Sequence, residues 1–144
     1  MASNTRPKFK HPIIREEKTE EDFHWIEPDV LISVCTDDHI RRIQWRGLDV
    51  IIRSMIDLPE IPSFFSSVMS ACYDEEHDLF MPEMLDFAIR ANTVLRYSNI
   101  ILPDDAEEQY RILYGTDLFQ TVKDNICFDQ VESIIKAAEL SFSR

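Results

Sequence analysis

The sequence predicts a mainly α-helical protein, folded as a small orthogonal bundle of about six or seven helices. From residue 47 onward, apolar residues recur at the spacing of one helix face in most segments. Three of these segments open with an Asp that is followed three residues later by Glu or Gln, the pattern of a capping box. Acid-first pairs at i, i+4 recur in the same segments and favour helices. The pairs are Asp49 with Arg53, Asp86 with Arg90, Glu107 with Arg111, and Glu132 with Lys136.

Residues 1–18 are predicted to be a flexible basic N-terminal arm. They contain five Lys or Arg, two Glu, Pro7 and Pro12, and no sustained apolar period. The alternative is a peptide that becomes ordered on a partner. Residues 19–144 are predicted to form one acidic helical domain. Their net charge is −15, and the basic arm brings the net charge of the whole chain to −12. A short helix is expected over residues 19–27, with Thr19 as its N-cap.

Residues 29–46 allow two interpretations. The segment VLISVC at residues 30–35 fits either a buried strand or a helix with Pro28 at its first position. Residues 39–46 fit a short helix with Ile40 and Ile43 facing inward. We expect helix in both places, and a pair of strands here is the α+β alternative.

The next helices are expected over residues 47–56 and 63–72. The first has a helical apolar face made of Leu48, Ile51, Ile52, Met55 and Ile56. The motif LPEIP at residues 58–62 ends it, because two prolines cannot continue a helix. Ser63 is expected to cap the second, whose apolar face is made of Phe64, Phe65, Val68, Met69 and Cys72.

The sequence of the C-terminal half predicts four further helices. Pro82 suits the first turn of a helix that reaches about Ile100. Gly115 is expected to close the following helix in a left-handed conformation. The three last helices are expected to open at Asp104 with Glu107, Asp117 with Gln120, and Asp129 with Glu132.

No catalytic, cofactor-binding or metal-binding residue is predicted. The densest group of potential ligands is DEEHD at residues 74–78, but a calcium loop would need Gly where Leu79 stands and Glu where Leu85 stands. We interpret this segment as a solvated acidic loop. The three cysteines and four histidines are scattered, and none of them lies in a recognisable nucleophile pattern.

Three groups of residues are candidates for contact with a partner. Large apolar residues occur next to Pro82, at the end of the acidic loop and just after it, where burial in the core is less expected. A tryptophan lies among arginines at residues 42–46, and Trp and Arg dominate interface hot spots. Two isoleucines form the apolar part of the arm. The candidate partner-binding residues are therefore Phe80, Met81, Met84, Trp45, Arg42, Arg46, Ile13 and Ile14.

These features favour a non-enzymatic protein-binding module over an enzyme. An apolar groove rimmed by carboxylates would hold a basic or apolar helical segment of another protein. Small cytoplasmic assembly factors, adaptors and chaperones, including those that phages encode for virion and tail assembly, have this size and charge. The acidic body argues against nucleic-acid and membrane partners, and a homo-oligomer is compatible with the sequence. Without a secretory signal or a long apolar run, a cytoplasmic location is expected.

Two alternatives stay open. The first is an acidic decoy or inhibitor that occupies a nucleic-acid-binding protein, which predicts carboxylates spread along one face. The second is an enzyme with an unrecognised site, which predicts a deep pocket where histidine or cysteine meets carboxylates.

Overall fold

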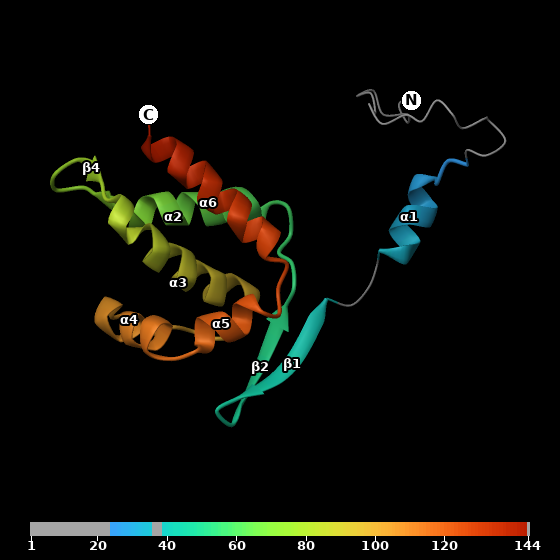
Figure 1. Ribbon diagram of the computed structural model, residues 1–144, viewed down its shortest axis with the longest axis horizontal. Helices are drawn as coiled ribbons and strands as arrows, with labels where there is room; N and C mark the ends of the chain where they lie inside the picture. The colour runs from blue at the N-terminus through green and yellow to red at the C-terminus, as the bar shows by residue number, and fades with distance from the viewer. Residues whose placement is uncertain (1–23, 36–38, 144) are drawn as a thin grey trace. The chain divides into compact units, whose positions relative to one another are not determined.

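The computed structural model describes residues 24–35 and 39–143, which belong to two separate units divided after residue 37 (Figure 1). The described residues contain six α-helices, one 3-10 turn and two small antiparallel sheets, so the prediction of a mainly α-helical protein is confirmed. The predicted arm, with Ile13 and Ile14, lies outside the described residues.

The first unit contributes α1 (Pro28–Val34), a helix of seven residues. Pro28 stands in its first turn, where its fixed φ suits a helix and its missing N–H costs nothing. Of the two interpretations of residues 30–35, helix is therefore the one observed. Residues 24–27 are not helical, so the helix expected over 19–27 is wrong in its described part.

The second unit begins with a β-hairpin of β1 (Ile40–Trp45) and β2 (Leu48–Arg53). The short helix expected over residues 39–46 and the helix expected over 47–56 are both wrong. Arg46 and Gly47 connect the strands, and both have positive φ, 52° and 81°. Two such residues form the type I′ turn whose twist matches that of the flanking strands.

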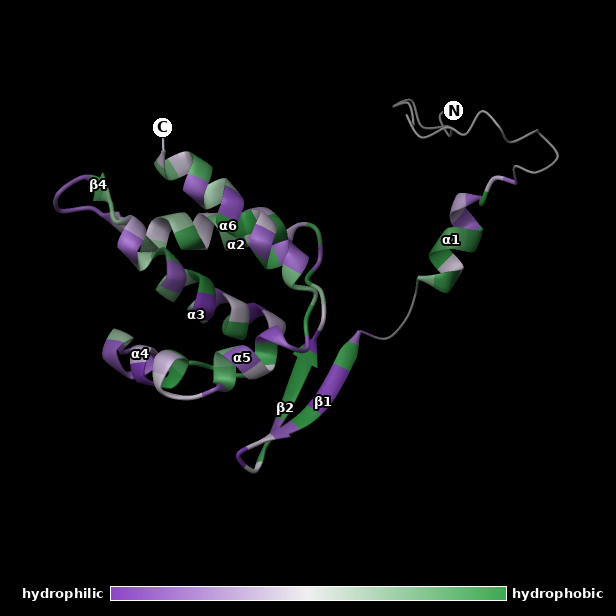
Figure 2. Ribbon diagram, in the orientation of Figure 1, coloured by the Kyte–Doolittle hydropathy of each residue, from purple (hydrophilic) through white to green (hydrophobic). Residues whose placement is uncertain are grey.

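The burial of β2 shows why the helical interpretation failed. Val50 and Ile52 are buried, whereas Leu48 and Met55, which the helical pattern placed inward, are exposed. Alternate burial is the pattern of a strand with one face on the core. Figure 2 shows how hydrophobic residues dominate β2, while β1 alternates between hydrophilic and hydrophobic.

Helix α2 (Glu60–Ala71) begins three residues earlier than Ser63. Pro59 is its N-cap residue and Pro62 lies in its first turn, where proline is tolerated. Phe64, Val68 and Cys72 of its expected apolar face are buried. The chain then makes a small hairpin of β3 (Tyr73–Asp74) and β4 (Leu79–Phe80).

A 3-10 turn, η3 (Pro82–Met84), leads into α3 (Leu85–Tyr97). The helix was expected to reach Ile100 but ends at Tyr97. Ser98 has an extended backbone and forms a bridge with Ile52 of β2. Asn99 forms two hydrogen bonds with Ile51. Its backbone N–H donates to Ile51 O, and its side-chain oxygen accepts from Ile51 N. Pairing with the hairpin thus ends the helix before Pro103 can.

The last helices are α4 (Ala106–Gly115), α5 (Leu118–Lys123) and α6 (Phe128–Phe142). Their existence is confirmed, but two of the predicted caps are displaced. Asp105 rather than Asp104 caps α4, by accepting from Glu108 N at 3.0 Å, and Cys127 precedes α6 in place of Asp129. Gly115 is the last residue of α4 and does not adopt a left-handed conformation.

Helix α3 lies between the pair α2 and α6 and the pair α4 and α5, and it contacts all four (Figure 1). The core gathers on α3 and on the faces that these elements and β2 turn toward one another. Its buried apolar residues are Val50, Ile52, Ile56, Phe64, Val68, Cys72, Ala88, Ile89, Val94, Tyr97, Leu113, Leu118, Phe119, Val122, Val131, Ile134 and Ala138.

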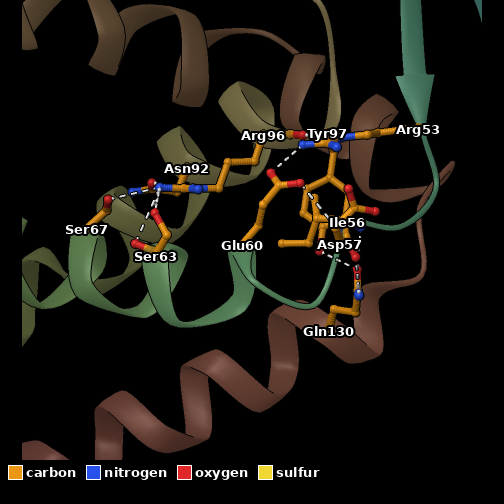
Figure 3. Close-up of polar contacts among 10 residues, drawn as sticks. All are labelled: Arg53, Ile56, Asp57, Glu60, Ser63, Ser67, Asn92, Arg96, Tyr97 and Gln130. Carbon is orange, nitrogen blue, oxygen red and sulfur yellow. Dashed lines mark hydrogen bonds and ion pairs between the residues drawn. The ribbon is translucent and has the colours of Figure 1, made fainter.

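A polar junction around Gln130 joins α6 to α3 and to the loop after β2 (Figure 3). The side-chain oxygen of Gln130 accepts from Ile56 N at 3.0 Å and from the Tyr97 hydroxyl at 2.8 Å. Its amide nitrogen donates to Ile56 O at 3.1 Å. Burial raises the pKa of the Tyr97 phenol well above its usual range, so the hydroxyl keeps the proton that it donates.

Two arginines extend this junction to α2 (Figure 3). Arg53 donates to the carboxylate of Glu60 at 2.6 Å and to the backbone oxygen of Arg96 at 2.8 Å. The hydrogen bond from Arg53 lowers the pKa of Glu60 against the opposing effect of burial. Arg96 donates to Ser67 Oγ at 3.0 Å and lies 5.6 Å above the ring of Phe64. The junction fixes the position of α3, which carries part of the site described next.

Candidate partner-binding groove

A surface groove of about 420 Å³ lies between the start of α3 and helix α4. We call it the aromatic groove. Glu83 and Met84 of η3 and Phe87 of α3 form one side, and α4 forms the other. The residues that α4 contributes are Ala106, Glu107, Tyr110 and Tyr114.

Three aromatic rings in the groove pack against one another. The ring of Phe87 is 6.5 Å from that of Tyr114, at 21°, and 6.5 Å from that of Tyr110, at 46°. The rings of Tyr110 and Tyr114 are 4.7 Å apart with 25° between their planes, so these two are stacked. Tyr110 and Tyr114 are four residues apart on α4 and therefore lie on the same side of the helix. Offset stacking of this kind is a favoured arrangement of aromatic side chains.

Arg90 and Asp86 hold Tyr114 in place. The Tyr114 hydroxyl donates to Asp86 Oδ2 at 2.5 Å, and Arg90 Nε donates to the same oxygen at 2.9 Å. The guanidinium of Arg90 lies 4.3 Å above the ring of Tyr114 and 4.8 Å above that of Phe119. Burial, together with the hydrogen bond to Asp86, raises the pKa of Tyr114 to about 12. The phenol therefore stays neutral at physiological pH.

The groove is open at Tyr110 and acidic at its rim. Tyr110 is 53% exposed and Tyr114 is 37% exposed, so their aromatic surface is only partly covered. Glu83 and Glu107 are the charged residues of the lining, and both are exposed. The first turn of α4 adds Glu108 beside Glu107. The groove thus combines uncovered π surface with negative charge and has no Lys or Arg in its lining.

Of the three apolar candidates near Pro82, only Met84 lines the aromatic groove. Phe80 is 46% exposed and its ring packs against those of Tyr73, at 5.0 Å, and Phe142, at 5.7 Å. It therefore contacts the end of α6 rather than α4. Met81 is half-buried, and its backbone N–H donates to Cys72 O at 2.6 Å.

The candidates Trp45, Arg42 and Arg46 lie on the β1–β2 hairpin. The indole N–H of Trp45 donates to Asp117 Oδ1 at 2.8 Å, and the ring is half-buried against the core. Arg46 lies 5.0 Å above the ring of Trp45 and 3.7 Å from Asp117. Arg42 is exposed on β1 and lines a separate hollow of about 400 Å³ on the hairpin. Trp45 therefore anchors the hairpin to the start of α5, and these residues do not join Met84 in one site.

Apart from Met84, the residues that line the groove were not among the predicted site residues: Glu83, Phe87, Ala106, Glu107, Tyr110 and Tyr114. The two tyrosines matter most, because they carry the exposed aromatic surface. The signal was present, since α4 is a short helix with two tyrosines four residues apart and acids in its first turn. A short helix packed on one side can bury only part of two such rings.

The acidic segment at residues 74–78 forms the turn between β3 and β4 and closes on itself. Asp74 Oδ2 accepts from His77 Nδ1 at 2.7 Å, and Asp74 also accepts from Glu76 N. The hydrogen bond from His77 lowers the pKa of Asp74. The carboxylates of Asp74 and Glu76 and the ring of His77 lie within 4.8 Å of one another. Asp74 is half-buried at the end of β3, and Glu76 and His77 are exposed in the turn.

The three cysteines are free and stand in different surroundings. Cys35 is exposed, Cys127 is half-buried and Cys72 is buried. Burial raises the pKa of the Cys72 thiol, which keeps it protonated and unreactive at neutral pH.

The sequence matches no protein-family model, and neither a curated protein nor a solved structure matches it. Among the helices of residues 24–35 and 39–143, none combines the length and the apolar character that a membrane span requires. The interpretation of the aromatic groove therefore rests on its own chemistry.

Proposed function

We propose that this chain is a non-enzymatic protein-binding module that holds a basic segment of another protein in the aromatic groove. One observation carries the proposal: the groove is lined by three packed aromatic rings, two of them tyrosines with exposed surface, and by the carboxylates of Glu83 and Glu107. Tyrosine is among the residues enriched at the hot spots that carry most of the binding energy of protein interfaces. Carboxylates at the rim attract basic partners and discourage acidic ones.

The first unit supports the same class of function. Helix α1 and the residues before it carry six large apolar side chains, and each is more than half exposed. These residues are Trp25, Ile26, Val30, Leu31, Ile32 and Val34. Several exposed apolar side chains on one short segment are typical of binding segments and favour protein binding over an acidic decoy, which would expose mainly carboxylates.

The finer role that we propose is that of a cytoplasmic assembly factor, adaptor or chaperone. A preformed groove beside a helical core suits a protein that holds a partner segment without changing it chemically. We also propose that α2 to α6 pack as an orthogonal bundle, because α3 contacts four other helices, more neighbours than the two of an up-and-down bundle.

A peptide selection tests the proposal. The full chain is immobilised, peptides are selected from a random library, and the affinity of each for the chain is measured by fluorescence anisotropy. Tyr110→Ala removes the most exposed ring of the groove. Leu140→Ala is the matched control, because Leu140 is also an exposed apolar residue on a helix, 64% exposed on α6.

We expect selected peptides to be basic, and to lose about tenfold in affinity with Tyr110→Ala but not with Leu140→Ala. Circular dichroism of both variants should match the parent, because neither side chain is buried. Peptides that bind both variants equally well, or a selection that yields no specific peptide, would refute the groove as a binding site.

A further inference from the structure

The geometry of the rings points to the chemistry of the bound residue, an inference that rests on the proposed function. We propose that the aromatic groove takes an arginine side chain of the partner, with its guanidinium stacked on Tyr110 and paired with Glu83 or Glu107. The occupant is thus a planar cation carried by a polypeptide.

The arrangement of the rings favours a planar cation over a tetrahedral one. A methylated ammonium is bound in an aromatic cage, whose rings surround the cation. Here the rings of Tyr110 and Tyr114 are stacked at 25°, and Phe87 packs 6.5 Å from each of them at 46° and 21°, so the rings contact one another and do not surround a cation. Tyr110 is the most exposed of the three rings, and a guanidinium, which is planar and always charged, stacks on aromatic faces.

The chain already contains this interaction on the neighbouring ring. The guanidinium of Arg90 lies 4.3 Å above the ring of Tyr114 and is held there by Asp86 at 2.9 Å. The groove repeats the same parts without a cation, since it has a tyrosine ring that is 53% exposed and a carboxylate nearby. An incoming arginine at Tyr110 would extend the series Arg90, Tyr114, Tyr110 by one planar group.

Charge complementarity supports the same occupant. Glu83 and Glu107 are the only ionisable acids or bases in the lining besides the two phenols. Both are exposed, so each carboxylate keeps its water until it meets a cation. A guanidinium can donate two parallel hydrogen bonds to one carboxylate, which an ammonium cannot. This pairing gives arginine an advantage over lysine at the same site.

The test uses three small probes of equal size class with the full chain: N-acetyl-arginine methylamide, the lysine analogue and the citrulline analogue. Citrulline has the shape of arginine without its charge. Binding is followed by NMR through the ring resonances of Tyr110 and Tyr114, and the dissociation constants are compared.

We expect arginine to shift the Tyr110 resonances and to bind at least threefold more tightly than citrulline or lysine. Glu107→Gln and Glu83→Gln should each weaken arginine binding about two- to threefold and leave citrulline binding unchanged. Raising the salt concentration should weaken arginine binding in the same way. Leu140→Ala should change none of these constants.

Equal shifts from arginine and citrulline, or tighter binding of lysine, would overturn the inference. So would arginine binding that the two Gln variants leave intact. These outcomes differ from failure of the proposed function. Library peptides that need Tyr110 but contain no arginine would refute only the inference, whereas arginine binding without any specific peptide would refute only the function.

Discussion

Replacing Gln130 with Met tests whether the junction in Figure 3 holds the fold together. Met has a similar volume and a similar helix propensity, so the change removes the amide and little else. It leaves three groups without their partner: the backbone N–H and C=O of Ile56 and the hydroxyl of Tyr97. Both residues are buried, 3% and 0% exposed.

The size of the loss follows from these three groups. A buried polar group that loses its partner costs about 1–3 kcal/mol. Gln130 itself is only half-buried, so water can reach part of the site and lower the total. We expect Gln130→Met to reduce the free energy of unfolding by about 2–4 kcal/mol, measured by urea unfolding followed by circular dichroism.

Tyr97→Phe is the internal control, because it removes one hydrogen bond together with its donor and should cost about 1 kcal/mol. In the double variant the two losses should not add, since the Tyr97–Gln130 bond is removed only once. A loss below about 0.5 kcal/mol for Gln130→Met, or simple additivity in the double variant, would refute the junction as a stabilising element.

Three further outcomes are expected, each measured by chemical denaturation. Gly47→Ala should destabilise the chain by about 1–2 kcal/mol because its φ of 81° strains any side chain, whereas Gly115→Ala, which meets open space without positive φ, should be neutral or slightly stabilising. Phe64→Ala should reduce the free energy of unfolding by about 3–5 kcal/mol because the ring is fully buried on α2. A smaller loss would mean that neighbouring side chains move into the space that the ring leaves. The pKa of Glu60 is lowered, so its pairing with Arg53 stabilises the fold above the unfolded pKa and is lost as the pH falls through the folded one. The stability gap between the parent and Glu60→Gln should therefore shrink from neutral pH to below about pH 4, and a constant gap would contradict the assignment.

The helices of the C-terminal half could be predicted because their local signals and their packing agree. Helices α4, α5 and α6 begin within two residues of the acid predicted to cap each of them, and they carry apolar residues at helical spacing. The pair of Asp86 and Arg90 forms as expected, at 2.9 Å. Displaced caps are a smaller error, since neighbouring acids such as Asp104 and Asp105 compete for the same position.

The hairpin could not be predicted from periodicity alone. Residues 48–56 place apolar side chains where both a helix and a strand could use them, and the choice depends on partners far along the chain. Ile52 forms a bridge with Ser98, and Ile51 is hydrogen-bonded to Asn99, both just after α3. The local clues were the β-branched run at residues 50–52 and the two-residue connection Arg46-Gly47. They were outweighed by the apparent helical spacing.

The candidate site was anticipated in its chemistry but only in part in its residues. An apolar groove with an acidic rim was expected near Met84, and Met84 does line one. The opposite wall comes from Tyr110 and Tyr114, whose approach to Phe87 depends on how α4 packs against α3. No pattern within a single segment contains that packing, so the sequence could not name both walls of the groove.

The long reach of the hairpin's bonds has a consequence for how the chain folds during synthesis. Trp45 in the hairpin and Ile56 in the loop after it find their partners Asp117 and Gln130 only 72 and 74 positions later. At the usual rate of about five to twenty residues per second, synthesis leaves these two residues without those partners for several seconds. We therefore expect nascent chains that stop before α6 to engage chaperones, and those that include it to be released.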